Sequence, residues 1–377
     1  MVVGVLPIKN ISNFIQQNIV FCLATVGAVL SAFIVPPSAA YISYLDFRVL
    51  GLLFALMAVV KGFERAGVFV LLTRHLFRLL HTTRQLAGAM IFACFFASMW
   101  ITNDVSLITF VPFAMVAFRQ VGQEAQLIKV VVLQTVAANL GSMCTPVGNP
   151  QNLYLFMVSG MGVREFVLLL LPYTVLSFLL LVLFLVWFPK TDLGSLPEKQ
   201  TQKNSGKTLP LPLLLGLFLL CMLTVGNVVD YRVTFFAVLI LCGLYDRVLL
   251  KQLDYVLLLT FIVFFIFIGN LKHIPIVYDF FTRQTVGHEF LVSLLASQVI
   301  SNVPAAILLS GFTKNYAGLM LGTDIGGLGT LIASMASLIS YKLYVAEYGN
   351  PGKYLWTFTW VNGVFLVVLV GAWGALG

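Results

Sequence analysis

The chain has 377 residues, of which 60% are hydrophobic and 10% are charged, and its formal net charge is +8. This composition excludes a soluble globular protein, and a run that is apolar on every side, Leu253–Gly269, excludes a barrel of alternating strands. The positive charge does not indicate nucleic-acid binding, because the basic residues lie between hydrophobic spans, where the positive-inside rule accounts for them. We therefore expect an all-α polytopic membrane protein.

The N-terminal part of the chain contains two ordinary predicted spans. Met1–Asn18 is too polar to cross a bilayer, and Ile19–Val35 and Leu45–Val60 are the first two apolar segments. In Gly67–Leu80, basic side chains interrupt the apolar ones at a spacing typical of a helix that lies along the membrane surface.

Residues 85–118 are expected to form a re-entrant helical hairpin. Two apolar arms, Gln85–Trp100 and Val105–Phe118, flank a polar tip that carries Asp104. Each arm is shorter than the roughly 20 helical residues that cross a bilayer core. The tip should therefore lie near the middle of the membrane.

Residues 127–157 are long enough to span a membrane, yet their sequence predicts a break. Segment 139–152 contains two prolines and two glycines, which cannot all lie within one unbroken helix. We expect a discontinuous helix whose free backbone groups face a cavity, because lipid cannot satisfy them.

A linker divides the chain near its middle. One more ordinary span, Arg164–Phe188, completes the N-terminal repeat, which we place at residues 1–188. Residues 189–209 are rich in Lys, Gln, Ser and Gly and form the expected cytoplasmic linker. The C-terminal repeat then comprises residues 210–377.

The C-terminal repeat follows the same plan as the first. Its ordinary spans are predicted at Leu211–Val228, Val233–Leu250, Tyr255–Leu271 and Leu355–Leu376. A short amphipathic piece, Ile274–Gln284, precedes the second re-entrant hairpin at residues 287–312. A second discontinuous helix is expected at residues 316–344, because the glycine-rich segment Gly322–Thr330 interrupts it.

Two matching pairs of segments indicate an internal repeat. Ala97–Asn103 and Ala296–Asn302 share the pattern Ala-Ser-x-x-Ile-(Ser/Thr)-Asn. Leu140–Ser142 aligns without a gap with Leu321–Thr323, so that Gly141 corresponds to Gly322. Each repeat is thus expected to contain one hairpin and one discontinuous helix.

The distribution of basic residues predicts the topology. With the N-terminus and the linker in the cytoplasm and the C-terminus outside, few of the 22 lysines and arginines face outward. The outward-facing ones are Arg48, Arg164, Arg232, Lys272, Arg283 and Lys314. The two hairpins then enter from opposite sides, so the repeats are inverted. Inverted repeats with broken helices at the membrane midplane are typical of secondary transporters that work by alternating access.

Asp104 and Asp324 are the only two of the 14 acidic residues that we expect at membrane depth. A central Asp costs about 2.5–3.5 kcal/mol to insert, so each needs a partner, a proton or a cation. Asn103 and Asn302 lie at equivalent points of the two tips, where an amide can donate and accept. Their alternative role is a turn residue that caps the following arm. We favour ligand contact, because both repeats carry one.

The candidate site residues come from the tips and the breaks. The predicted substrate-binding residues are Thr102, Asn103, Asn149, Asn152, Ser301, Asn302 and Thr330. The predicted coupling-ion residues are Asp104, Asp324, Gly148 and Gly329. The coupling ion is expected to be a proton or sodium, and sodium would lie near Asn103, Asp104 and Gly148. No other cofactor is expected.

At these residues the chain resembles the ion transporter superfamily, which includes arsenite/antimonite permeases, D-type sodium/proton antiporters and divalent anion/sodium symporters. Thr102–Ile108, Gly148–Asn152 and Ser301–Pro304 look most like the arsenite-permease and anion-permease branch, with its citrate-transporter-like domain. The resemblance covers nearly the whole chain. It implies a transporter fold and a homodimer, and it does not specify the substrate.

The tip sequences depart from those of the carboxylate symporters in this superfamily. In those symporters each tip bears Ser-Asn-Thr, contacts substrate and borders a sodium site. Here the tips are Thr102–Asp104 and Ser301–Val303, so the first has gained a carboxylate and the second has lost a hydroxyl. An Asp at the tip repels a dicarboxylate unless a cation or a proton intervenes. It suits a neutral or weakly acidic substrate such as arsenous acid.

We therefore expect an ion-coupled permease of the inner or plasma membrane for a small anion or oxyanion such as arsenite. The alternatives are a sodium/proton antiporter, in which Asp104 and Asp324 exchange the ions, and a di- or tricarboxylate symporter. An enzyme is not expected, because the chain has no His-Glu-x-x-His motif and no second acid beside either Asp. The expected partners are a small substrate, the lipid bilayer and a second copy of the chain.

Overall fold

The computed structural model describes residues 19–68, 80–192 and 209–376. Met1–Asn18, most of the expected surface helix Gly67–Leu80 and most of the linker 189–209 therefore lie outside the described residues. Within the described ranges the elements are helices, and the one recorded β interaction is an isolated bridge between Thr82 and Asp192. The prediction of an all-α fold is confirmed.

In the described part of the N-terminal half, six helices precede the first break and two follow it. They are α2 (Ile19–Ala32), α3 (Ala40–Tyr44), α4 (Phe47–Arg65), α6 (Thr83–Ile101), α7 (Asn103–Gln120), α8 (Leu127–Ser142), α9 (Pro150–Ser159) and α10 (Val163–Phe184). The discontinuous helix thus comprises α8 and α9.

The C-terminal half has a similar order of helices. They are α11 (Leu211–Val225), α12 (Tyr231–Tyr245), α13 (Arg247–Lys251), α14 (Tyr255–Lys272), α15 (Pro275–Thr285), α16 (Glu289–Ile300), α17 (Asn302–Leu309), α18 (Tyr316–Gly326), α19 (Met335–Tyr348) and α20 (Pro351–Leu376). The second discontinuous helix comprises α18 and α19.

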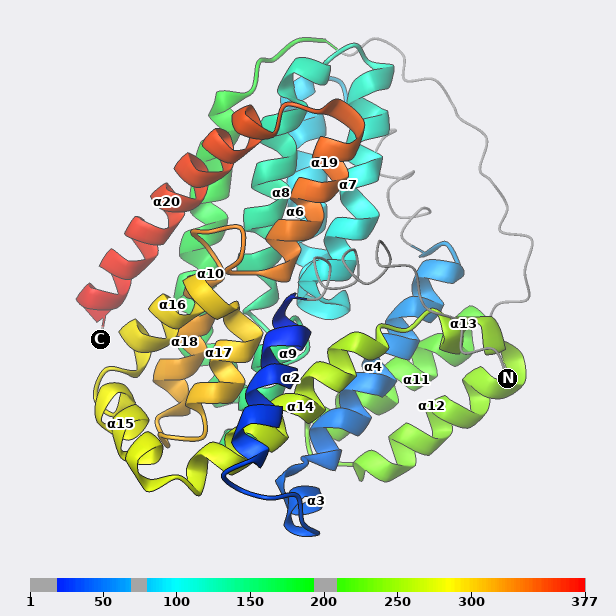
Figure 1. Ribbon diagram of the computed structural model, residues 1–377. Coiled ribbons are helices and arrows are strands. Elements are labelled where there is room, and N and C mark those ends of the chain that lie inside the picture. Colours follow the sequence, from blue (N-terminus) through cyan, green and yellow to red (C-terminus); the bar gives the residue numbers. More distant parts are fainter. Residues whose placement is uncertain (1–18, 69–79, 193–208, 377) are drawn as a thin grey trace, which may run out of the picture.

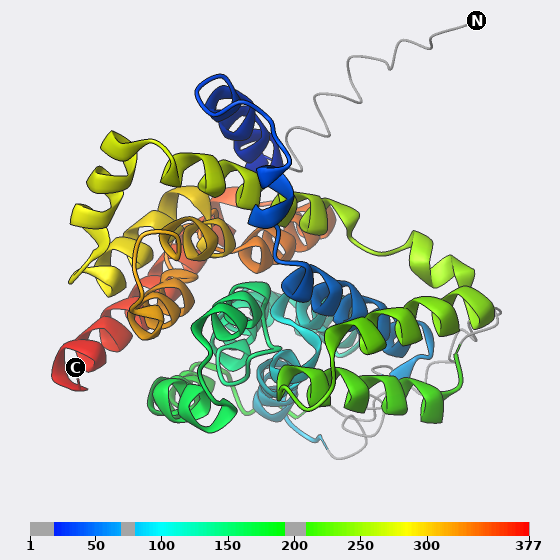
Figure 2. The ribbon, with the colours of Figure 1, turned by 90° about the horizontal axis from the view of Figure 1, so that it is seen from below.

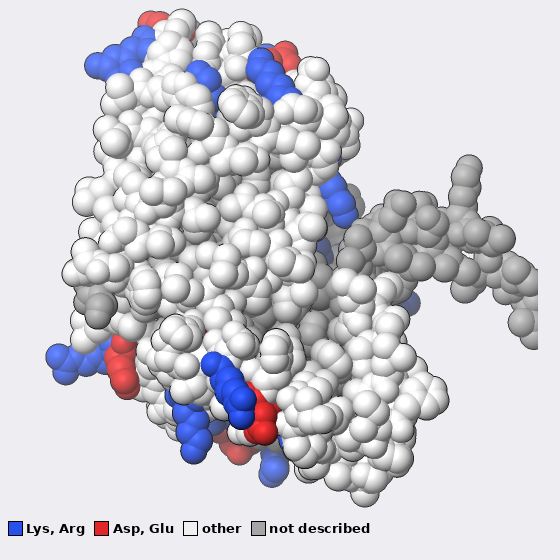
Figure 3. All heavy atoms as spheres, turned by 60° about the vertical axis from the view of Figure 1, so that its left-hand side comes forward, with Lys and Arg blue, Asp and Glu red and all other residues white. Residues whose placement is uncertain are grey.

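Helix length and surface charge identify a multi-pass membrane protein. Among the described residues, five helical segments are long and apolar enough to cross a membrane, namely Thr83–Ile101, Glu124–Ser142, Val163–Trp187, Tyr255–Lys272 and Pro351–Ala375. On the face shown in Figure 3, charged side chains gather mainly at the upper and lower ends, and a broad uncharged band lies between them. Such a band is what a hydrocarbon environment requires, because charged side chains are costly there.

The two broken helices lie side by side in the centre of the molecule. Helix α8 packs against α19, and α9 packs against α18. In Figure 1, α8 and α19 occupy the upper half and α9 and α18 the lower half, so the two breaks meet at mid-height. The pair α6–α7 lies in the upper half of this view and the pair α16–α17 in the lower half. Entry of the two pairs from opposite sides of a membrane stays a prediction.

Helices α6 and α7 run antiparallel to each other. Gln134 Nε2 on α8 donates to the carbonyl oxygens of both Met90 on α6, at 3.3 Å, and Phe110 on α7, at 3.1 Å. These bonds satisfy the NH₂ group of a fully buried side chain and hold all three helices together. The chain reverses at Thr102, which lies between the two helices.

The first hairpin has longer arms than the sequence predicted. Helix α6 has 19 residues and α7 has 18. A capping box, in which Thr82 and Gln85 bond each other's backbone N–H groups, starts α6 at Thr83. By length α6 can cross a membrane, so re-entrance of this hairpin stays a prediction. The arms of the second hairpin, α16 and α17, have 12 and 8 residues.

The remaining helices surround this centre. Helices α11 and α12 pack against α4 on one side, and α2 packs against α14 on another, as Figure 2 shows from below. Helices α10 and α20 both contact α8. The predicted span Val233–Leu250 is wrong in one respect, because α12 ends at Tyr245. The next residue, Asp246, is the N-cap of α13. Its carboxylate also accepts a hydrogen bond from Arg65 Nε at 2.8 Å.

We expect the Asp46→Ala variant to lose about 0.5–2 kcal/mol of stability. Asp46 caps α4, and its Oδ1 accepts from the backbone N–H groups of Arg48 and Val49, each at 3.0 Å. The Asp46→Asn variant keeps an oxygen acceptor and should lose little. Thermal unfolding of the purified protein in detergent measures both variants, and equal stability of Asp46→Ala and wild type would contradict the cap.

Candidate functional site

Both hairpin tips hold a residue in a strained backbone conformation. Thr102 has φ 72° and ψ 152°, and Ser301 has φ 74° and ψ 155°. This region is populated almost only by glycine and costs about 1–3 kcal/mol for other residues. Such strain persists where the surroundings over-determine the backbone. Its occurrence at equivalent positions of the two repeats makes both tips candidates for a functional role.

The tips are held by the helix breaks of their own repeats. Asn103 N donates to the Gly148 carbonyl at 3.1 Å, and Asn302 N donates to the Ala333 carbonyl at 2.9 Å. Each tip asparagine also turns its side-chain oxygen back to the next backbone N–H, at 3.0 Å for Asn103 and 2.9 Å for Asn302. Each tip is therefore fixed to an unwound segment.

The structure corrects the alignment of the two broken helices. A Cβ atom on Gly141 would clash with the Phe95 carbonyl and lie 2.7 Å from Ser98 Oγ, whereas one on Gly326 would lie 3.0 Å from Ser297 Oγ. Ser98 and Ser297 are equivalent residues of the repeat. The tip bonds also make Gly148 equivalent to Ala333, and this offset is the one that relates Gly141 to Gly326. Gly141 therefore corresponds to Gly326, about one helical turn beyond the predicted partner Gly322.

This correspondence makes Asn139 the equivalent of Asp324, so two polar clusters occupy equivalent positions in the two repeats. Asn139 is 4% exposed. Its Oδ1 accepts from Asn103 Nδ2 at 3.1 Å and from Ser334 Oγ at 2.9 Å, and its Nδ2 lies 3.5 Å from Ser337 Oγ. This neutral cluster joins the first tip to the second broken helix.

The equivalent cluster in the other half contains a carboxylate. Asp324 is 2% exposed, and its Oδ1 accepts from Asn149 Nδ2 at 3.1 Å and from Gln151 Nε2 at 3.4 Å. Its Oδ2 accepts from Asn152 Nδ2 at 2.9 Å. Asn149 also caps α9, because its Oδ1 accepts from Asn152 N at 2.8 Å. The donors come from the start of α9, so this cluster joins the two broken helices.

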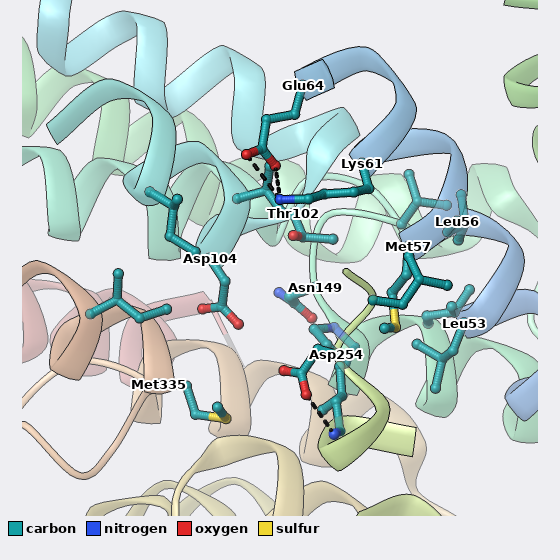
Figure 4. A pocket seen from close by; sticks show the side chains of 18 of the residues that line it. Leu53, Leu56, Met57, Lys61, Glu64, Thr102, Asp104, Asn149, Asp254 and Met335 are labelled. Atoms are coloured by element: carbon teal, nitrogen blue, oxygen red, sulfur yellow. Dashed lines mark hydrogen bonds and ion pairs between the residues drawn. The ribbon is translucent and has the colours of Figure 1, made fainter. Parts of the chain in front are cut away.

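A cavity of about 210 Å³ lies beside the first tip. Thr102, Asp104 and Asn149 line its inner part, and the exposed residues Gln252 and Asp254 line its outer part. Figure 4 shows Asp104, Asn149 and Asp254 around this space. Asp104 Oδ1 is buried and has no hydrogen-bond partner among the described residues. The cavity therefore presents a carboxylate that can accept a proton or a cation.

The cavity wall has more negative than positive charge. Its lining includes Asp104, Asp254, Glu64 and Lys61. Lys61 Nζ lies 2.8 Å from Glu64 Oε2, so these two charges neutralise each other (Figure 4). The carboxylates of Asp104 and Asp254 remain, which favours a cation or an uncharged molecule over a multivalent anion.

The structure brings most of the predicted site residues together. Thr102, Asp104 and Asn149 line the cavity, Asn152 and Asp324 lie in one cluster, and Asn103 lies in the other. Ser301 and Asn302 form the second tip. The carbonyl of Gly148 accepts the hydrogen bond from Asn103 N at the first tip. Thr330 is exposed and bonds Gln298, with Gly329 beside the same side chain, so neither lines the cavity.

Five residues of the two clusters and the cavity were not among the predicted site residues. Asn139, Ser334 and Ser337 form the neutral cluster, Gln151 donates to Asp324, and Asp254 lies at the cavity wall. The correct register of the broken helices would have identified the first three. Asp254 caps α14 through Leu257 N, at 3.0 Å, and in sequence it is indistinguishable from any other helix cap. No cluster of three or more His, Cys, Asp or Glu is arranged for a metal ion in the described ranges.

Comparison with known proteins identifies the family. The family model described as "Citrate transporter" matches residues 11–325. Uncharacterized transporter MJ0456 of Methanocaldococcus jannaschii is 35% identical over 298 residues, which cover 78% of this chain and 80% of that protein. Inner membrane protein YbiR of Escherichia coli is 29% identical over 348 residues, which cover 89% of each. Silicon efflux transporter LSI3 of rice, Oryza sativa subsp. japonica, is 34% identical over 155 residues, which cover 40% of this chain and 30% of that protein. The chain belongs to the citrate transporter family and is a membrane transporter, not an enzyme.

Proposed function

We propose that this protein is an ion-coupled secondary transporter for a small oxyacid or oxyanion such as arsenite. The observation that carries the proposal is the position of Asp104. Its Oδ1 is buried at the wall of the cavity beside the first tip and lacks a partner among the described residues. A buried carboxylate in a membrane protein needs a proton or a cation, and binding of that ion can be linked to substrate binding in the same cavity.

The charge of the cavity supports an uncharged substrate. Asp104 and Asp254 repel a citrate ion, which carries several negative charges, and the lysine of the cavity is already paired with Glu64. Arsenous acid is uncharged at neutral pH and carries hydroxyl groups that donate to carboxylates and accept from amides. Thr102 and Asn149, which line the same space, provide a hydroxyl and an amide for these bonds.

The similarity to a silicon efflux transporter supports the same class of substrate. Dissolved silicon at neutral pH is silicic acid, a small uncharged molecule with several hydroxyl groups. The relative matches 155 residues of this chain at 34% identity. We therefore include silicic acid beside arsenous acid among the substrates to be tested.

Alternating access is part of the proposed mechanism, and the similar order of helices in the two halves supports it. Under the predicted topology, the outer part of the cavity at Gln252 and Asp254 faces the cytoplasm. The second hairpin then closes the opposite side. During transport the side of the first hairpin would close and the side of the second hairpin would open. Inverted repeats exchange their conformations in this way in other carriers.

Uptake into liposomes tests the proposed substrate class. Purified full-length protein is reconstituted, and uptake of arsenite, silicic acid, sulfate and citrate is measured by elemental or isotopic analysis, with protein-free liposomes as the control. We expect uptake of arsenite or silicic acid above the control. Uptake of citrate alone would contradict the proposal, and would assign the carboxylate symporter function instead.

A further inference from the structure

When Asp324 is ionised, its cluster holds a negative charge that the hydrogen bonds of neutral amides do not neutralise. The three donors are the neutral amides of Asn149, Gln151 and Asn152, and the carboxylate is 2% exposed. The cavity beside Asp104 is not lined by Asp324. The cluster is therefore a second polar centre, which shares Asn149 with the wall of the proposed substrate cavity.

Two amide oxygens in this cluster lack partners. Gln151 Oε1 and Asn152 Oδ1 accept no hydrogen bond from the described residues, although Gln151 is 2% exposed and Asn152 is fully buried. Each belongs to a side chain whose NH₂ group points to Asp324. A 180° rotation about the last side-chain torsion exchanges the oxygen and the nitrogen of an amide. After this rotation the oxygens of Gln151 and Asn152 point to the carboxylate of Asp324. That arrangement is repulsive unless a cation lies between them.

Backbone carbonyl groups also lie at this point, beside the positive N-terminal end of α9. Helices α8 and α18 both end here, at Ser142 and Gly326, and their carbonyl ends carry partial negative charge. The Met143 carbonyl, just past the end of α8, lies 3.5 Å from Asn152 Nδ2, a long contact that leaves this oxygen available. Unwound carbonyls at the ends of broken helices are typical ligands of coupling ions.

We propose that Asp324, Gln151 and Asn152 bind a sodium ion through their side-chain oxygens, with the Met143 carbonyl as a further ligand. A proton on Asp324 needs one acceptor, whereas this cluster offers two free amide oxygens besides the carboxylate. The amides rotate when the ion enters, which relieves the two unpaired oxygens and neutralises the charge. The role of this ion in driving transport rests on the proposed function, but its binding does not require any substrate.

Thermal unfolding of the purified full-length protein in detergent tests this site. Sodium chloride replaces choline chloride or potassium chloride at constant ionic strength, and no substrate is present. We expect sodium to raise the Tm of the wild type with a logarithmic dependence on concentration, because it binds the folded state. We expect no such rise in Asp324→Asn. In Gln151→Met, which keeps the carboxylate, the half-maximal sodium concentration should rise about tenfold or more, as with lost metal-site partners.

The neutral cluster provides a matched control. Ser337→Ala changes the residue equivalent to Asn152 in the Asn139 cluster and should leave the response to sodium unchanged. Equal shifts of the wild type with sodium and choline would overturn the proposal, as would a sodium response retained in both Asp324→Asn and Gln151→Met. If Asp324→Asn fails to fold, Gln151→Met decides the result. Stabilisation by acid without any sodium dependence would assign the site to a proton instead.

Discussion

Replacing Asp104 with asparagine is expected to abolish ion-coupled transport and to leave the protein folded. The Oδ1 atom of Asp104 is buried and has no partner among the residues that the structure describes. The amide has nearly the same shape but carries no charge and binds no proton, so the coupling ion loses its ligand. Removal of an uncompensated buried charge should not lower stability, and the Tm should equal or exceed that of the wild type.

Asp254→Asn is the matched control for this change. It makes the same chemical substitution in the same cavity, and asparagine preserves the cap of α14. Because Asp254 is exposed, its charge is better screened, and we expect only a partial loss of uptake. Uptake is measured in liposomes with an imposed ion gradient. Full coupled transport by Asp104→Asn would remove this residue from the mechanism.

Gly141→Ala is expected to produce a large loss of stability. A Cβ atom at this position would clash with the Phe95 carbonyl and lie close to Ser98 Oγ. The obstacle is backbone, so no change of rotamer relieves it, and α8 must move away from α6. Overpacking of this kind costs about 1–3 kcal/mol or more.

Gly243→Ala in α12 provides the comparison, since no atom lies within 4 Å of the position its Cβ would take. Alanine in an open helical position stabilises by about 0.5–1 kcal/mol relative to glycine. The two variants should therefore change the Tm in opposite directions in thermal unfolding in detergent. Equal stability of Gly141→Ala and Gly243→Ala would show that α6 and α8 are not packed as closely as the structure indicates.

The helix breaks and tips could be predicted because their signals are local. Prolines and glycines between residues 139 and 152 cannot continue a helix, and the structure ends α8 at Ser142 and restarts the chain as α9 at Pro150. The shared pattern around Asn103 and Asn302 identified both tips. The backbone strain at Thr102 and Ser301 was not predictable, because neither residue type favours that conformation.

The register of the second broken helix could not be predicted from sequence. Gly322 and Gly326 lie one turn apart on α18 and both face α16, so either could match Gly141. The hydrogen bonds of the tips distinguish them, because Asn103 N bonds Gly148 and Asn302 N bonds Ala333. The same offset makes Gly141 equivalent to Gly326, and Asn139 equivalent to Asp324. Likewise, the pairing of Asp246 with Arg65 joins parts of the chain that are distant in sequence, and no local pattern specifies it.

The most direct test of the central claim is substrate accumulation in liposomes under an imposed ion gradient. The substrate is the one identified by the uptake comparison, and internal pH and sodium are recorded together with it. Ion-coupled transport predicts that the substrate accumulates above its external concentration while a proton or sodium gradient is present, and that an ionophore abolishes the accumulation. Two results would contradict ion-coupled transport of this substrate. One is equilibration of the substrate that does not depend on a proton or sodium gradient, and the other is a proton flux triggered by sodium without any substrate.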